Sequence, residues 1–319
     1  MTLLYTDARF LLHETGDHPE CAERLHHITS HLETTPLMDR CEQPQWEMIS
    51  DQVLLRVHQR ELAFQLQGLA EQGGGQADPD TVVSPRSPEI AKLAAGAVCN
   101  ATQQVLDGNA RSALCLVRPP GHHALPDRAM GFCLLNNIAL AAQSALDRGV
   151  NRLLVVDWDV HHGNGTQACF YEDPRVGFFS AHRWPFYPGT GSVEETGSSD
   201  GLGTTCNLPM EFGTSRANYR QSFQRNLEDF AARINPELVL ISAGFDSHRL
   251  DPVGSLGLEI EDFSWLTSTV TQIADTYAQG RIVSALEGGY NPPILAACVA
   301  AHLESLLING SDGISRYAP

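Results

Sequence analysis

The stretch Leu153-Leu-Val-Val-Asp-Trp-Asp-Val-His-His-Gly-Asn-Gly-Thr166 decides the fold class. It opens as a continuous apolar run, which is typical of a buried strand in a parallel sheet, and we expect this strand at 153–160. Asp157, Asp159 and His161 occupy every second position, so on a strand they would project from one face. Such a cluster needs a cation or hydrogen-bond partners. On this stretch alone, a metal site and acids that cap the next helix are equally good interpretations.

Apolar strands alternate with helical patterns along the rest of the chain. This alternation predicts an α/β domain in which a mostly parallel sheet is covered by helices on both faces. Residues 73–80 are interpreted as a flexible acidic loop, with a contact to substrate as the less favoured alternative. No repeat or linker is visible, so 1–319 is expected to form a single domain. Further strands are expected at 3–5, 113–117, 176–180, 238–243 and 282–286, and helices at 51–71, 87–106, 134–146, 219–234, 263–278 and 294–307.

Composition excludes several classes of protein. The net charge is −17 and no basic patch is present, so direct binding to nucleic acid is not expected. The eight cysteines are scattered without a C-x-x-C pair, which favours a reducing compartment over disulfides or a Cys-rich zinc site. No signal peptide is recognisable, and no apolar run approaches the ~20 residues that span a bilayer. We expect a cytoplasmic protein without a membrane partner; an oligomer is compatible with this composition.

Four of the expected strands run directly into polar side chains. Ligands of open parallel sheets bind outside the carboxyl ends of the strands, so these groups should assemble one site. The groups are His122-His123, the set Asp157, Asp159 and His161, then Asp246, and Tyr290.

Asp159, His161 and Asp246 form a three-ligand set with an open position, as catalytic zinc sites do. Ligation rich in oxygen would also admit Fe²⁺ or Co²⁺. Asp157 lies one step deeper on the expected strand, where it could orient a neighbour or bind a second cation.

The tandem His122-His123 becomes a general acid/base candidate beside a metal site, with Asp157 and Asn164 available to orient the two rings. Tyr290 follows a Gly-Gly turn and could donate to an oxyanion; the alternative is an aromatic packed on a surface turn. These groups predict metal-assisted hydrolysis of an amide. The sequence has no P-loop or dinucleotide-binding motif, and none of the expected strands runs directly into a G-x-S-x-G elbow.

Five motifs, in order over nearly the whole chain, resemble the zinc-dependent histone deacetylase family, and look closest to class II enzymes and their bacterial homologues. The resemblance implies the arginase/deacetylase fold, a three-layer α/β/α sandwich with about eight mostly parallel strands. It implies an amidohydrolase that cleaves linear amide C–N bonds and removes acetyl or other acyl groups from lysine or related amines. The motifs are Arg118-Pro-Pro-Gly-His-His-Ala124, Gly131-Phe-Cys-Leu-Leu-Asn-Asn137, Val156-Asp-Trp-Asp-Val-His-His-Gly-Asn-Gly-Thr166, Ser242-Ala-Gly-Phe-Asp246 and Glu287-Gly-Gly-Tyr-Asn291.

The resemblance implies a role for each ligand and histidine. Asp159, His161 and Asp246 would bind one zinc ion. His123 would be the main general acid/base, and His122 would be its electrostatic partner.

The resemblance also implies that Asp157 holds His122 and that Asn164 holds His123. Class I members have Asp at the position of Asn164, so the neutral residue here follows class II. Tyr290 would polarise the acetyl carbonyl. Some class IIa members have His there and are nearly inactive, so Tyr290 predicts deacetylase activity.

A narrow tunnel for the acylated amine is implied as well. Phe132 and Tyr187 would flank its stem, and Gly131 would offer its carbonyl. Relatives that deacetylate polyamines have an acidic gatekeeper where this chain has Val253, which cannot recognise a distal ammonium. Acyl-lysine-like substrates, small or peptidic, are therefore favoured over acetylpolyamines, although an acid from 78–80 could take over that recognition.

The family also binds monovalent cations, and the resemblance implies two structural potassium sites. The first would use Asp157 and Ser180 with backbone carbonyls of Asp159, His161 and Ala181; the second would use the carbonyls of Phe170, Asp173 and Val176.

Two rival functions share parts of this pattern. A binuclear manganese ureohydrolase of the arginase type would need further bridging Asp/His ligands, which the opening stretch does not supply. A non-enzymatic acyl-lysine-binding module would be expected to lose Tyr290 or a metal ligand, and this chain keeps both.

Overall fold

An eight-stranded sheet forms the centre of the structure, a computed structural model that describes residues 1–311. The strand order is β2-β1-β5-β10-β9-β6-β7-β8, and all the pairings in this sheet are parallel. The predicted parallel sheet is therefore confirmed. The strands are β1 (Thr2–Tyr5), β2 (Cys41–Glu42), β5 (Ser112–Cys115), β6 (Leu153–Asp157), β7 (Val176–Arg183), β8 (Thr205–Met210), β9 (Val239–Ala243) and β10 (Ile282–Leu286).

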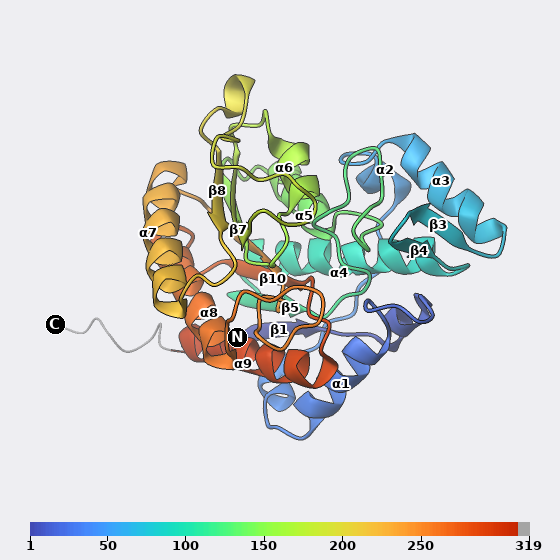
Figure 1. The fold of residues 1–319 in the computed structure, drawn as a ribbon, viewed down its shortest axis with the longest axis horizontal. Coiled ribbons are helices and arrows are strands. Elements are labelled where there is room, and N and C mark those ends of the chain that lie inside the picture. The colour runs from blue at the N-terminus through green and yellow to red at the C-terminus, as the bar shows by residue number, and fades with distance from the viewer. Residues whose placement is uncertain (312–319) are drawn as a thin grey trace.

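Helices cover both faces of this sheet, as Figure 1 shows. On one face α4 packs against α5, and on the other α9 packs against α1 and α8, with α7 beside α8. The helices are α1 (Glu23–Glu33), α2 (Asp51–Leu54), α3 (Arg60–Glu71), α4 (Ser87–Leu106), α5 (Asn137–Asp147), α6 (Asn164–Phe170), α7 (Arg216–Ile234), α8 (Ile260–Tyr277) and α9 (Pro292–Ser311).

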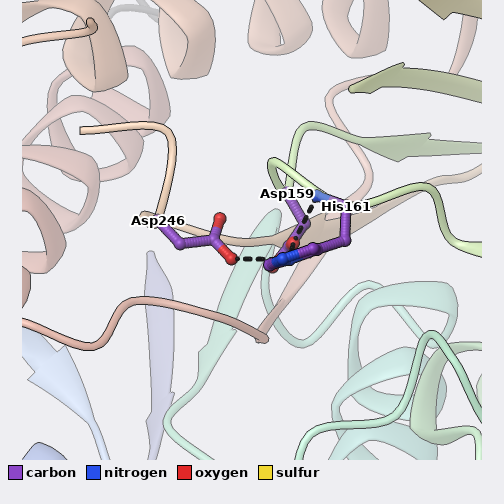
Figure 2. A group of neighbouring side chains, drawn as sticks. All are labelled: Asp159, His161 and Asp246. Carbon is purple, nitrogen blue, oxygen red and sulfur yellow. Dashed lines mark hydrogen bonds and ion pairs between the residues drawn. The ribbon is translucent and has the colours of Figure 1, made fainter. Parts of the chain in front are cut away.

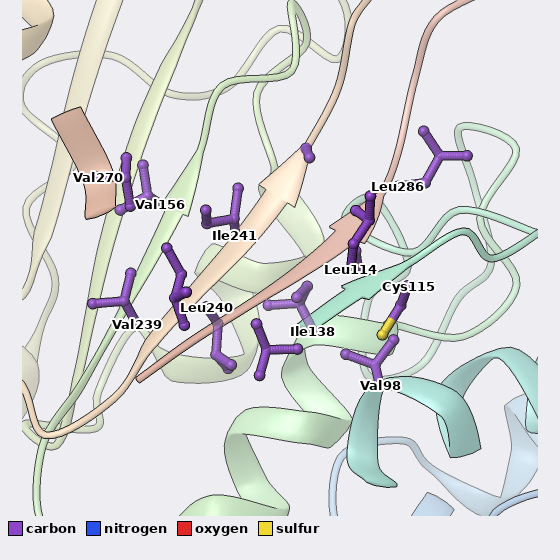
Figure 3. Close-up of a cluster of buried hydrophobic side chains, with 14 of the residues drawn as sticks. Val98, Leu114, Cys115, Ile138, Val156, Val239, Leu240, Ile241, Val270 and Leu286 are labelled. Atoms are coloured by element: carbon purple, nitrogen blue, oxygen red, sulfur yellow. The ribbon is translucent and has the colours of Figure 1, made fainter. Parts of the chain in front are cut away.

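The central strands are buried along their whole length, which is why their sequences are mostly apolar and do not alternate between apolar and polar residues. Figure 3 shows part of this core, where Val98 and Ile138 come from α4 and α5, and Val270 comes from α8. Burial of this apolar surface from both sides fixes the sheet between the helical layers. The residues at the carboxyl ends of its strands are therefore held in rigid positions.

Four predicted elements need correction. The expected helix 51–71 is interrupted between α2 and α3, because Gln59 is extended and its N–H donates to the carbonyl of Pro126 at 2.7 Å. The segment 73–80 is no flexible loop: β3 (Gly75–Asp78) and β4 (Thr81–Val83) pair as an antiparallel hairpin. The strand expected at 153–160 ends at Asp157, and α5 begins three residues later than expected, at Asn137, behind its cap Asn136.

Residues 312–319, which the predicted single domain included, lie outside the described residues. Within residues 1–311, none of the helices combines the length and the apolar character that a membrane crossing requires.

Candidate metal centre and active site

Four neighbouring strands deliver the polar residues to one place. The strands β5, β10, β9 and β6 are adjacent in the sheet, and each is followed by one of the four polar groups that the sequence singles out. Parallel strands end at the same edge, so residues that are far apart in sequence meet there.

Asp159, His161 and Asp246 form a buried cluster at this edge (Figure 2), in which one potential ligand atom of each residue lies within 4.8 Å of the others. His161 Nδ1 lies 3.0 Å from Asp159 Oδ1 and 3.1 Å from Asp246 Oδ2. Apart from this contact with His161, the buried Asp246 Oδ2 has no hydrogen-bond partner among the described residues. The structure thus brings the three predicted metal ligands together, and a carboxylate oxygen of one of them, Asp246, is available to bind a cation.

A divalent cation fits this donor set. Two carboxylates and one imidazole nitrogen leave room for substrate or water in a four-coordinate site. Burial and the neighbouring charge of Asp159 raise the pKa of Asp246 to about 7, so the pair of acids is electrostatically costly by itself. A bound cation would remove that cost, because it neutralises the repulsion between the two carboxylates.

The chain reaches this geometry through a turn rather than a continued strand. Asp157 Oδ1 accepts the N–H of Asp159 at 3.0 Å, and Asp159 Oδ1 accepts the N–H of His161 at 2.9 Å. Each acid therefore holds the backbone two residues ahead of it, as Asx turns do. The alternate spacing predicted convergence correctly, but Asp159 and His161 lie beyond the end of β6.

The two adjacent histidines have different partners. His122 Nδ1 donates to Asp157 Oδ2 at 2.9 Å, and His123 Nδ1 donates to Asn164 Oδ1 at 2.7 Å. Burial alone would lower the pKa of His122, but the carboxylates around it, led by Asp157, outweigh burial and raise that pKa to about 10. Burial and the charges of His122 and His161 hold the pKa of His123 well below its ordinary value. Near neutral pH, His122 is protonated and His123 is neutral.

Glu287 supports the histidine loop, a contact that the sequence analysis missed. This buried carboxylate accepts the N–H of Gly121 at 2.7 Å and that of His122 at 3.1 Å through Oε2. Its position directly after β10 was a usable signal, because the other polar groups of the site also follow strands.

A pocket of about 240 Å³ leads to the metal cluster and collects the predicted tunnel residues. Burial raises the pKa of Tyr290 well above its ordinary value, so its hydroxyl keeps its proton. Phe186, which the sequence analysis did not single out, stacks on His161 with ring centroids 5.2 Å apart. The lining residues are Asp80, His123, Gly131, Phe132, His161, Phe186, Tyr187, Val253 and Tyr290.

The hairpin β3–β4 shapes one wall of this pocket. Gly131 and Phe132 both have positive φ, and a Cβ on Gly131 would lie 2.4 Å from His123 Cδ2. The N–H of Gly131 donates to Asp80 Oδ1 at 3.2 Å, and that of Phe132 donates to Thr81 Oγ1 at 3.1 Å. The segment predicted as a loose acidic loop thus holds the backbone that packs on His123.

The residues of the predicted potassium sites lie in two groups. Asp157 and Ser180 face each other across β6 and β7, with Ala181 next along β7. Residues of the second group surround the turn from α6 to β7, where the N–H of Asp173 donates to the carbonyl of Phe170 at 3.0 Å and Val176 begins the strand. Both potassium sites stay predictions.

Comparisons with known proteins identify the family. A model of the histone deacetylase domain matches residues 18–306. The chain is 39% identical to a histone deacetylase-like amidohydrolase of Pseudomonas aeruginosa, over 91% of this chain and 77% of that protein. It is 41% identical to an uncharacterised protein of Synechocystis sp. (slr0245), over 96% of this chain and all of that protein. The crystal structure of the HDA15 HD domain superposes with a TM-score of 0.91 at 36% identity, covering 96% of this chain and 88% of that one.

The eight-stranded parallel sheet between two helical layers is the arginase/deacetylase fold, which the resemblance of the sequence motifs implied. The buried Asp-His-Asp cluster agrees with the metal dependence of the matched family. The chain therefore belongs to the histone deacetylase family and is a deacetylase hydrolase.

Proposed function

We propose that this protein is a zinc-dependent amidohydrolase that removes acetyl or other acyl groups from acylated lysine or related amines. The observation that carries the proposal is the buried cluster of Asp159, His161 and Asp246 beneath a pocket that His123 and Tyr290 also line. When bound there, zinc supplies Lewis acidity toward the acyl carbonyl and toward the attacking water.

His123 acts as the general base and then as the general acid. Its Nδ1–H is engaged by Asn164, so Nε2 carries the free lone pair that takes the proton from water. The same proton is then given to the departing amine, which leaves His123 neutral again. His122 stays protonated against Asp157 and supplies a fixed positive charge beside this exchange.

Tyr290 donates its hydroxyl proton in a hydrogen bond to the developing oxyanion. The hydroxyl is neutral at all pH values of interest because burial raises its pKa. A donor that is already in place in a buried site costs little reorganisation, which is why such groups lower the barrier strongly.

The pocket wall selects for an extended aliphatic stem. Phe132 and Tyr187 contribute aromatic surface for the methylene groups, Gly131 offers its carbonyl to the amide N–H, and Val253 supplies an apolar rim. This lining suits acyl-lysine, free or within a peptide, and longer acyl chains compete for the same space.

Acetylpolyamine hydrolysis is the second candidate, and Asp80 is the residue that favours it. Asp80 lines the pocket at the tip of the hairpin, where a carboxylate would attract a distal ammonium despite the apolar Val253. The hydrogen bonds of Asp80 Oδ1 to Gly131 and Thr81 hold that carboxylate in place.

We further propose that the whole chain acts as one catalytic domain in the cytoplasm. One or two potassium ions would have a structural role at the predicted sites, with Asp157 and Ser180 at the first and the α6–β7 turn at the second.

The test uses one zinc-loaded preparation and a panel of acetyl-lysine peptides, longer acyl-lysines and acetylpolyamines. Tyr290→Phe and His123→Ala should each lower kcat about 10²–10³-fold while zinc stays bound. Tyr277→Phe, which removes a hydroxyl at the far end of α8, is the matched control and should keep full activity. Near-normal rates in either site variant would refute the mechanism, and two tightly bound manganese ions per chain would point to an arginase-type enzyme instead.

A further inference from the structure

Asp251 connects Tyr290 to the wall of the substrate pocket. The side chain is buried, with 9% of its surface exposed, in the segment between β9 and α8. Its Oδ1 accepts the N–H groups of Val253 and Gly254, both at 2.9 Å. Its Oδ2 accepts the N–H of Tyr290 at 2.6 Å. One carboxylate therefore joins two segments that are 39 residues apart in the chain.

The Tyr290 segment needs such an anchor. It follows Gly288 and Gly289, whose backbone has more freedom than that of any other residue type, and Gly289 has a φ of +125°. Arg24 holds this turn from one side, because its guanidinium donates to the carbonyls of Glu287 and of Gly289, the latter at 2.7 Å. The bond from Tyr290 N–H to Asp251 fixes the residue that carries the phenol itself.

The second segment that Asp251 holds belongs to the pocket. Val253 lines the cavity, and the carbonyl of Gly254 accepts Arg183 Nη1–H at 3.1 Å. The guanidinium of Arg183 lies 4.1 Å from the ring centroid of Phe186, which lines the pocket too. The turn 253–254 is thus bound to both Phe186, through Arg183, and Tyr290, through Asp251.

Charge makes these bonds strong and specific. Hydrogen bonds from backbone N–H groups to a carboxylate are shorter and stronger than those to neutral acceptors. Asp251 uses both oxygens in this way, and an amide in its place would present an NH₂ group to at least one of the backbone donors. An Asn at this position would keep the side-chain volume, but it would lose the hydrogen bonding to at least one of the two backbone segments.

We infer that Asp251 is a positioning residue for catalysis: it places the Tyr290 hydroxyl at the acyl oxygen and ties that placement to the Val253 wall. The inference rests on the proposed function, in which Tyr290 donates to the oxyanion. Asp251 itself touches neither substrate nor metal ligands in this arrangement; it acts through the backbone of Tyr290.

A double-mutant cycle tests the inference, with kcat and KM of zinc-loaded wild type, Asp251→Asn, Tyr290→Phe and the double variant measured on one acetyl-lysine peptide. Asp251→Asn should lower kcat about 10-fold or more, because small misplacements of a catalytic group cost that much. In the Tyr290→Phe background the same change should lower kcat less than about 2-fold, because the hydroxyl that Asp251 positions is absent. Zinc content should be equal in all four proteins.

Two controls separate positioning from general damage. Asp262→Asn removes another buried carboxylate, in the capping box of α8 against Arg216, and should lower the melting temperature without lowering kcat. If Asp251→Asn does not fold, Asp251→Glu enters the same cycle. It keeps the charge and moves the oxygens by one methylene, and it should show the same dependence on Tyr290.

The outcomes also distinguish the inference from the proposed function. If Tyr290→Phe leaves kcat unchanged, the proposed function fails and the inference fails with it. If Tyr290→Phe lowers kcat but Asp251→Asn has its full effect in both backgrounds, the proposed function stands and the role of Asp251 is overturned.

Discussion

Asn164 Oδ1 lies 2.7 Å from His123 Nδ1, so a neutral amide orients the histidine that faces the pocket. The neighbouring His122 has the carboxylate of Asp157 as its partner. Burial and the charges of His122 and His161 lower the pKa of His123, and the difference in partner adds to the separation from His122, because a carboxylate stabilises the protonated form more than an amide does. The same edge of the sheet thus holds, side by side, one imidazole with a raised pKa and one with a lowered pKa.

Asn164→Asp should therefore move the pH dependence of the reaction. A carboxylate next to His123 favours its protonated form and raises its pKa. The base must be neutral to act, so the acidic limb of kcat/KM should shift upward by about one pH unit or more. Asn109→Asp adds the same charge on the surface and should leave the profile in place. An unchanged limb in Asn164→Asp would show that His123 is not the group that titrates.

Asp246→Ala should abolish metal binding rather than only slow the reaction. It removes one of three ligands and leaves a two-residue set, whereas Asp147→Ala removes a surface carboxylate and should keep the metal. The measurements are the zinc content after dialysis and the melting temperature with and without added zinc. Wild type and Asp147→Ala should retain zinc and melt at a higher temperature when zinc is added, whereas Asp246→Ala should do neither. Stoichiometric zinc in Asp246→Ala would contradict the assignment of the centre.

The sequence predicted those elements whose residues carry their own signal. The strands β6, β9 and β10 are mostly apolar because helices cover both of their faces, and α4 has the predicted bounds. The strand β8 was missed: Thr205–Met210 is an edge strand that pairs with β7 alone and contains Asn207 and Pro209, so it has no continuous apolar run.

The candidate site divides in the same way. The metal cluster, the histidines and Tyr290 each follow a strand, so their convergence was predictable from topology. The supporting contacts were not, because each joins segments remote in sequence: Glu287 meets Gly121 across 166 positions, and Asp80 meets Gly131 across 51. A single sequence carries no sign of which distant backbone N–H a buried acid will accept.

Glu20→Gln should destabilise the fold strongly, because Glu20 is fully buried between two arginines. Its Oε2 lies 2.9 Å from Arg118 Nη2, and its Oε1 lies 3.2 Å from Arg24 Nη1. Removing the charge leaves two buried guanidinium groups without their carboxylate, which costs ~3–5 kcal/mol of unfolding free energy. Glu89→Gln breaks an exposed pair with Arg86 and should cost less than ~1 kcal/mol. Urea unfolding at pH 7 measures both.

The same carboxylate predicts a dependence on pH. Burial opposes ionisation of Glu20, but the charge of Arg118 outweighs it and lowers the pKa from 4.5 to about 2. Because the pKa of Glu20 is lower in the folded state than in the unfolded state, its ionised carboxylate stabilises the fold. This stabilisation is fully present above about pH 4.5 and is lost as the pH falls toward 2. The difference between wild type and Glu20→Gln should therefore shrink below pH 4.5. A constant difference would contradict an ionised Glu20.

His58 should make the fold sensitive to mild acid. Its Nε2 accepts the N–H of Asn136 at 2.9 Å, and its Nδ1 donates to the carbonyl of Leu125 at 3.0 Å, so the ring must be neutral. Burial lowers its pKa from 6.5 to about 4. The stabilisation of the fold by the neutral His58 ring is fully present above pH 6.5. It is lost as the pH falls toward 4, which lowers the unfolding free energy by up to ~3 kcal/mol.

His58→Gln should flatten that part of the profile. The amide oxygen of Gln can still accept from Asn136, but nothing at that position titrates. At pH 7.5 the variant should be less stable by ~1 kcal/mol, for the lost bond to Leu125. Between pH 6.5 and 4.5 the unfolding free energy of wild type should fall more steeply than that of the variant, so the two curves should converge. Parallel curves in urea titrations across this range would mean that His58 does not gain its proton on unfolding.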